Sequence, residues 1–164
     1  MSIKKGFTHE SPVSTSVSWY TPPSLFQVLG MVFEIDVCAP EGGVDWIPAK
    51  RHFSEIDDGL KQEWQGTCWC NPPYGKGVEH WLNKMAEHGD GVVLIPSRTD
   101  TKWFQEAAKK ADCVLFLKGR LQFIDGLSKT KVSGNSVGSV LLGYGDYSVN
   151  SLSKLKECGV YYEY

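Results

Sequence analysis

The 164-residue sequence has no long hydrophobic run and no apolar leader. No stretch approaches the roughly 18 apolar residues that a membrane-spanning helix needs. Residues 1–17 are rich in Ser and Thr and have no apolar segment behind their lysines. We therefore expect no membrane insertion and no secretion, but a cytoplasmic protein whose residues 1–17 are mobile.

Paired cysteine spacings are also missing, because the five cysteines are odd in number and include no C-x-x-C. This pattern predicts reduced, mostly buried thiols rather than disulfides. Cys68 and Cys70 are one half of a conceivable zinc site, with His52, His80 and His88 as further ligands. Alternate residues of a strand share one face, so core packing explains this pair more simply, and we expect no metal.

A strong excess of positive charge is absent as well, since the net charge is −2. That value argues against a general nucleic-acid binder. Residues 76–131 nevertheless carry 10 basic and 7 acidic side chains, whereas residues 1–75 carry 5 and 9. A polyanionic partner would meet the middle of the chain, although a solvated face gives the same count.

What the sequence does contain is an alternation of short apolar strands and amphipathic helices, without repeats or linkers. The predicted strands cover residues 31–37, 66–70, 91–95 and 112–117, and the predicted helices cover 21–30, 77–89 and 100–111. The first helix is expected to use Thr21 as N-cap, with Pro22 and Pro23 in its first turn and Gly30 at its end.

Continuous apolar strands between helices predict an α/β fold with a mostly parallel sheet covered on both faces. Residues 119–126 and 136–145 are expected to add antiparallel strands near the C-terminus. At 164 residues the chain suits one domain, which we place over residues 18–164.

Polar clusters follow three of the predicted strands. They are Asp36 with Cys38 and Ala39, residues 71–74, and residues 96–100. Because ligands of open α/β sheets bind beyond the carboxyl ends of the strands, we expect these clusters to meet in one crevice.

The second cluster reads Asn71-Pro72-Pro73-Tyr74. Two prolines make a stiff loop whose carbonyl groups lack partners in the sheet, and Asn71 adds an amide. The Asn71 oxygen and the Pro72 carbonyl are suited to accept both hydrogens of an exocyclic amino group, while Tyr74 stacks on its ring. Accepting both hydrogens localises the lone pair of the nitrogen, which becomes a nucleophile without a strong base.

Two plainer interpretations exist for this loop. A Pro-Pro pair is also a rigid turn, and Asn-Pro-x-Tyr is a turn that adaptor domains bind in membrane-receptor tails. The second interpretation requires a membrane span, which the sequence lacks.

Several segments, in one order, resemble the phage-type Dam family of DNA N6-adenine methyltransferases, which depend on S-adenosylmethionine. The segments are "SWYTPPSLFQVL", "FEIDVCAP", "DDGLKQEWQGTCWCNPPYGKGVEHW", "LIPSRTDTKWF" and "LKGRLQF", within residues 18–124. The resemblance implies a Rossmann-like methyltransferase fold that binds double-stranded DNA. Its target adenine is flipped out of the duplex.

The resemblance also assigns roles to residues. Asn71, Pro72, Pro73 and Tyr74 form the catalytic loop. The cofactor site takes the segment before the first helix, the end of the first core strand and one later acid: Trp19, Tyr20, Thr21, Pro22, Asp36, Cys38, Ala39 and Asp58. Lys76, Arg98 and Arg120 are the substrate-binding candidates.

Plainer roles stand beside these. Asp36 is also a candidate helix cap, Asp58 a candidate exposed acid in a turn, and Trp19 and Tyr20 candidates for packing. Arg98 and Arg120 could instead pair with Asp100 and Asp125.

Two features depart from the family pattern. A glycine-rich F-x-G-x-G turn after the first strand is missing, and Gly42 and Gly43 come a few residues late. Near the end, residues 132–145 lack the proline and phenylalanine expected before the last strand.

Competing functions remain open from the residues alone. The same loop chemistry suits an RNA methyltransferase, a methyltransferase for a protein side-chain amide, or a small-molecule methyltransferase. A catalytically silent nucleic-acid-binding module would be expected to carry a damaged loop, and this loop is intact. After the core and the loop, little chain remains for target recognition. The sequence therefore predicts a brief target, loose specificity or a homo-oligomer.

Overall fold

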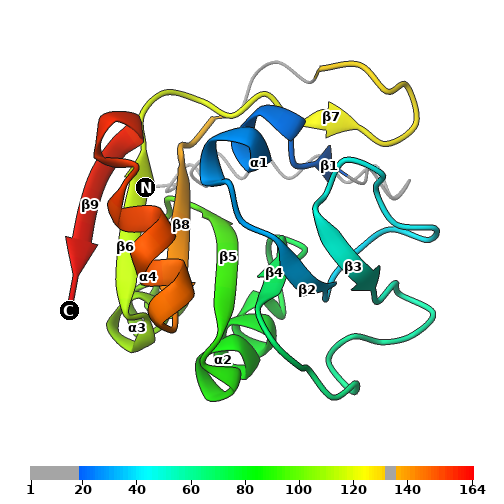
Figure 1. The fold of residues 1–164 in the computed structure, drawn as a ribbon, viewed down its shortest axis with the longest axis horizontal. Helices are drawn as coiled ribbons and strands as arrows, with labels where there is room; N and C mark the ends of the chain where they lie inside the picture. The colour runs from blue at the N-terminus through cyan, green and yellow to red at the C-terminus, as the bar shows by residue number, and fades with distance from the viewer. Residues whose placement is uncertain (1–18, 132–135) are drawn as a thin grey trace, which may run out of the picture.

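A seven-stranded sheet forms the centre of the computed structural model, which describes residues 19–131 and 136–164 (Figure 1). The expected mobile segment, residues 1–17, lies outside the described residues. The strand order is β3-β2-β4-β5-β8-β6-β9. The bounds are β2 Phe33–Asp36, β3 Ala49–His52, β4 Cys68–Cys70, β5 Gly91–Pro96, β6 Cys113–Leu117, β8 Ser139–Tyr144 and β9 Gly159–Glu163.

The sheet is mixed: five of its seven strands run in one direction, in line with the prediction of a mostly parallel sheet, but three of its six strand pairings are antiparallel. β3, β2, β4 and β5 pair in parallel, and β8 is antiparallel to both β5 and β6. β6 therefore runs in the direction of β5, and β9 pairs antiparallel with β6. The antiparallel strands are thus the last two along the chain: β8 confirms the strand expected at residues 136–145, whereas β9 was not predicted.

Helices cover both faces of the sheet, so the protein has three layers (Figure 1). α1 (Pro23–Leu29) and α4 (Asp146–Ser153) pack on one face, and α2 (Val78–His88) and α3 (Lys102–Lys110) pack on the other. Strand residues alternate between the two apolar clusters: Phe33 and Trp69 face α1, whereas Ile35, Cys68 and Cys70 face α2. A 3₁₀ helix, Lys156–Cys158, precedes β9.

Several local predictions were wrong, and each error has a physical reason. The N-cap of α1 is Pro22, because the buried Thr21 side chain bonds elsewhere. The expected strand at residues 119–126 shrinks to β7 (Ile124–Asp125), which pairs outside the main sheet with β1 (Trp19–Tyr20). β3 was not among the predicted strands because, as an edge strand with three exposed polar residues, it lacks an apolar pattern.

All five cysteines are free thiols, and Cys68, Cys70 and Cys113 are buried. Cys68 lies 3.6 Å from His88 Nε2, but this nitrogen is also 2.7 Å from the Gly66 carbonyl. Within residues 19–131 and 136–164, no three His, Cys, Asp or Glu side chains form a group that could hold a metal ion. No helix in this described part is long and apolar enough to cross a membrane.

Candidate active site

The carboxyl ends of three neighbouring parallel strands meet at one edge of the sheet. Asp36 ends β2 and lies opposite Trp69 of β4, which in turn lies opposite Val92 of β5. Asn71 directly follows β4, and residues 96–100 begin at the last residue of β5. The structure therefore places the three polar clusters at the same edge of the sheet, whereas their meeting in one crevice stays a prediction.

Asn71 is the most constrained polar side chain of the Asn-Pro-Pro-Tyr loop. Its Nδ2 donates to the Trp19 carbonyl at 3.3 Å and to Thr21 Oγ1 at 3.2 Å. Its Oδ1 accepts from the Tyr74 hydroxyl at 3.1 Å. The two donated bonds fix which amide atom faces Tyr74, and an amide oxygen has a second lone pair for a further donor.

The rest of the loop combines a buried anchor with exposed groups. Pro72 is buried, whereas Pro73 and Tyr74 are exposed, Tyr74 by 42%. Among the described residues, the Pro72 carbonyl accepts no hydrogen bond. The loop therefore presents two acceptor oxygens, Asn71 Oδ1 and Pro72 O, beside an accessible aromatic ring.

The segment before α1 reaches this loop although it is about fifty residues away in the sequence. Thr21 is 1% exposed and is held from two sides, by Asn71 at its hydroxyl and by Trp46 at its carbonyl, to which Trp46 Nε1 donates at 2.8 Å. The Tyr20 and Trp46 rings are in contact with centroids 6.1 Å apart. Trp46 was missed by the sequence analysis, because it lies in a loop without periodicity.

Within the residues that the structure describes, Asp36 is a buried carboxyl group without a cationic partner. It is 3% exposed, and its Oδ1 accepts only a long bond of 3.4 Å from the Cys38 backbone N–H among the described residues. Burial raises the pKa of Asp36 to about 7, against the weaker lowering effect of the Cys38 N–H. Asp36 does not cap a helix, and such a carboxyl group suits a ligand that brings donors or positive charge.

The neighbours of Asp36 differ in their surroundings. Cys38 is half-buried, and burial, with the nearby Asp36, raises the pKa of its thiol to about 12, so the thiol stays neutral. Ala39 is buried, and its N–H donates to the Phe53 carbonyl at 2.8 Å. This bond joins the chain after β2 to the chain after β3.

Asp58 stands in a turn that packs against the end of β2. A Cβ atom on Gly59 would collide with the Val37 carbonyl oxygen, so the turn passes close to that strand. Asp58 itself has a left-handed backbone (φ 54°), and its carboxylate pairs with Lys61 at 3.0 Å. The turn thus lies near the candidate site, but the Asp58 carboxylate is already paired with Lys61.

The three basic candidates are exposed. Arg120 lies beside β5 and β8, because a Cβ on Gly138 would be 3.1 Å from Arg120 Nη1 and 3.2 Å from Ser97 Oγ. In the described part of the chain, no ion pair joins Arg98 or Arg120 to Asp100 or Asp125. Lys76 follows the loop at residues 71–74. The pairing alternative is therefore not observed.

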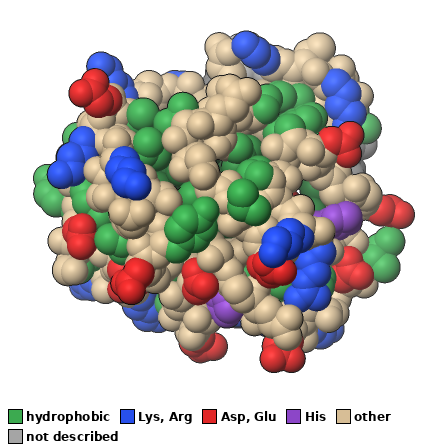
Figure 2. Space-filling model, in the orientation of Figure 1, with side chains coloured by type: hydrophobic (Ala, Val, Ile, Leu, Met, Phe, Trp, Pro, Cys, Tyr) green, Lys and Arg blue, Asp and Glu red, His purple; other side chains and the backbone are tan. Residues whose placement is uncertain are grey.

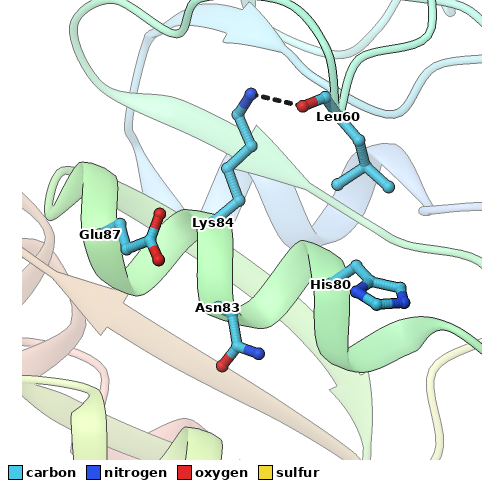
Figure 3. A pocket seen from close by; sticks show the side chains of 5 residues that line it. All are labelled: Leu60, His80, Asn83, Lys84 and Glu87. Atoms are coloured by element: carbon cyan, nitrogen blue, oxygen red, sulfur yellow. Dashed lines mark hydrogen bonds between the residues drawn. The ribbon is translucent and has the colours of Figure 1, made fainter.

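Charge is mixed elsewhere on the surface. Figure 2 shows acidic and basic side chains intermingled on the face that carries α1 and α4. A depression on the other side, beside α2, is lined by Leu60, His80, Asn83, Lys84 and Glu87 (Figure 3). Lys84 is bonded there to the Leu60 carbonyl at 2.7 Å, and none of the predicted site residues takes part. The strand ends remain the candidate active site.

Thr21→Val tests whether the hydroxyl of Thr21 positions Asn71. The change keeps the shape of the side chain but removes the acceptor of the 3.2 Å bond. We expect kcat of the reaction that this loop catalyses to fall about tenfold with little change in KM, as for the loss of one buried hydrogen bond. Steady-state kinetics give both values, and Ser24→Ala, at an exposed position of α1, is the control. A change in KM alone would contradict a positioning role.

Comparison with known proteins identifies the family. The model of the family described as DNA N-6-adenine-methyltransferase (Dam) matches residues 9–155. A protein of Escherichia phage T1, named DNA N-6-adenine-methyltransferase, is 26% identical over 144 residues, which cover 75% of this chain and 60% of the relative. The chain thus spans less than two thirds of that relative's length, and no solved structure matches it. Because the family model matches most of the sequence, the chain belongs to the DNA N-6-adenine-methyltransferase (Dam) family.

Proposed function

We propose that this protein transfers the methyl group of S-adenosylmethionine to the N6 amino group of adenine in double-stranded DNA. The family membership supports this activity, and the three-layer sheet architecture is consistent with a Rossmann-like methyltransferase domain over residues 18–164. The observation that carries the proposal is the orientation of the Asn71 amide. Its nitrogen is held by Trp19 and Thr21, so its oxygen is the atom available to a substrate.

The proposed chemistry follows from two acceptors and one ring. Asn71 Oδ1 and the Pro72 carbonyl each accept one hydrogen of the N6 amino group, and the exposed Tyr74 ring stacks on the adenine. The lone pair of N6 is then localised and forms the bond to the methyl carbon, while the carbon–sulfur bond of the donor breaks. One proton of N6 is released to solvent afterwards. The loop contributes mainly position and charge stabilisation.

The target base must leave the duplex for this reaction. N6 of a stacked and paired adenine donates to its partner base, so it is out of reach of a loop at the end of a sheet. A flipped adenine exposes its amino edge and both ring faces. The acceptors and the accessible Tyr74 ring suit this flipped base.

The residues beside the loop fit the donor molecule. S-adenosylmethionine supplies a methyl group on a sulfonium centre, and it also carries an ammonium group and ribose hydroxyls. Asp36 is a buried acceptor without a cation, which suits these donors. We place the cofactor against Asp36, Cys38 and Ala39, with the segment Trp19, Tyr20, Thr21 and Pro22 at its methionine end and Asp58 in a lesser role.

Lys76, Arg98 and Arg120 are proposed to contact DNA phosphates. We place the activity in the cytoplasm of a bacterial host, where a phage-encoded enzyme would mask DNA from restriction enzymes. A homo-oligomer would supply additional surface for recognition of the target sequence.

Transfer of labelled methyl groups tests the function directly. The purified protein is incubated with radiolabelled S-adenosylmethionine and unmethylated duplex DNA, RNA or no acceptor, and the products are digested to nucleosides. Label in N6-methyl-2′-deoxyadenosine, released from DNA and not from RNA, is the expected result. If label appears in RNA alone, the substrate is RNA and not DNA. If the protein binds the cofactor but transfers no label to any acceptor, the silent binding module is favoured.

A further inference from the structure

A short hairpin, residues 124–131, lies next to the candidate active site and has no role in the chemistry above. Its first strand, β7, pairs with β1, so that Asp125 lies opposite Trp19, and Ile124 also pairs with Lys131. The Trp19 carbonyl is one of the two groups that hold Asn71. The hairpin is therefore attached to the backbone that positions the catalytic loop. Figure 1 draws β7 beside β1, with its loop at the margin of the molecule.

Hydrogen bonds within the turn define its shape. Asp125 N–H donates to the Thr130 carbonyl, and Lys129 N–H donates to the Asp125 carbonyl, both at 2.9 Å. Asp125 Oδ1 accepts from the Leu127 and Ser128 N–H groups at 2.7 and 3.0 Å. Lys129 adopts a left-handed backbone (φ 58°), and its Nζ lies 4.8 Å from the centre of the Tyr20 ring. The tip is thus fixed both internally and to β1.

The exposed side chains of this turn are one apolar residue, two lysines, and Ser128 and Thr130, whose hydroxyls bond to each other. Leu127, at the tip, is 79% exposed, and Lys131 at the base is exposed. The one acid, Asp125, accepts bonds within the turn, and the Ser128 and Leu127 N–H groups lower its pKa. Arg120 precedes the hairpin on the same edge of the sheet. Figure 2 shows Lys or Arg side chains along the margin where Figure 1 places the loop after β7.

We propose that this hairpin enters duplex DNA at the target site, with Leu127 filling the space that the flipped adenine leaves. Lys131 and Arg120 meet the flanking phosphates. The inference rests on the proposed function. Apolar side chains inserted between base steps are a known means of unstacking DNA, and extruding a base costs a few kcal/mol. A single exposed leucine is ordinary on a protein surface. Its place on a turn that carries two lysines, and that pairs with the strand whose Trp19 carbonyl holds Asn71, is what gives it this role.

Leu127→Ala separates base extrusion from the rest of the reaction. The methylated site is first mapped with the wild-type protein on unmethylated DNA, and an oligonucleotide duplex with that site is then made in two forms. One form is intact, and the other lacks the base opposite the target adenine, which removes the pairing that extrusion must break. Val160→Ala is the matched control, because Val160 is an exposed apolar residue on β9.

We expect Leu127→Ala to lower the rate on the intact duplex about tenfold or more, and to recover to within about twofold of the wild type on the duplex without the partner base. Val160→Ala should match the wild type on both. An unchanged rate of Leu127→Ala on the intact duplex, or an equal loss on both duplexes, would overturn the insertion. Absence of wild-type methylation on any DNA would instead defeat the proposed function, so the two failures are distinguishable.

Discussion

Asn71→Ala is expected to lower methyl transfer to DNA by about a hundred- to a thousandfold, comparable with the loss of a preorganised hydrogen-bonding group in other active sites. The change removes the acceptor Oδ1 and also the two bonds from Nδ2 to Trp19 and Thr21. No neighbouring side chain replaces this acceptor, because the Tyr74 hydroxyl that contacts it is donating. The effect should fall on kcat, since the amino hydrogens are held most tightly as the nitrogen becomes tetrahedral.

Asn71 is half-buried and outside the two apolar clusters, so the protein should remain folded. Single-turnover rates, together with thermal unfolding and cofactor affinity of the same variant, distinguish chemistry from folding. A variant that binds S-adenosylmethionine normally, unfolds near the wild-type temperature and still methylates adenine would contradict the role of Asn71. If Asn71→Ala and Thr21→Val act through one hydrogen-bonded unit, their combination should cost little more than Asn71→Ala alone.

The central part of the fold could be predicted because several of its strands are short apolar runs. Residues 91–95 and 112–117 lie in such runs, and both correspond to core strands of the sheet. The polar clusters after β2, β4 and β5 follow from the same parallel arrangement. Local patterns therefore predicted that these clusters lie at one edge of the sheet.

Contacts between distant segments could not be predicted. Asn71 bonds to a carbonyl 52 residues away, and Trp46 bonds to Thr21 across 25 residues. Neither of these bonds produces a periodic pattern in the nearby sequence from which it could be predicted. The same holds for α4, whose "DYSVNSLS" sequence is rich in residues of modest helix propensity and is helical because Leu152 and Ser148 are buried against the sheet. The contacts that hold the candidate site in place could therefore be found only from the tertiary structure.

A contrast between stability and binding is expected for Asp36→Asn. The variant keeps the shape of the side chain and removes its charge. We expect its affinity for S-adenosylmethionine to fall about a hundredfold, because a charged hydrogen bond to a buried carboxylate is lost and the partner's donor is left poorly satisfied. Isothermal titration of the protein with the cofactor measures this loss. Cys158→Ser, a half-buried change after α4, serves as the control.

The stability of the same variant should change in the opposite direction. The pKa of Asp36 is raised from 3.8 to about 7 in the folded protein, so the folded state binds this proton more tightly than the unfolded state does. The contribution of Asp36 to the free energy of unfolding is therefore most favourable below pH 4, falls as the pH rises from about 4 to 7, and is constant above. The shift corresponds to at most about 4 kcal/mol.

Asp36→Asn removes this pH-dependent cost. In the cofactor-free protein, the unfolding free energy of the variant should therefore exceed that of the wild type by more at pH 8 than at pH 5. Cofactor donors favour the carboxylate, so wild-type affinity should rise between pH 6 and 8, whereas the affinity of the variant should stay flat. Denaturant unfolding and titration at these pH values provide both readouts. If the variant is destabilised at pH 8 and binds the cofactor normally, Asp36 is a structural residue. If instead the variant is stabilised and binding is lost, the protein retains a buried charge that costs folding stability because the cofactor requires it.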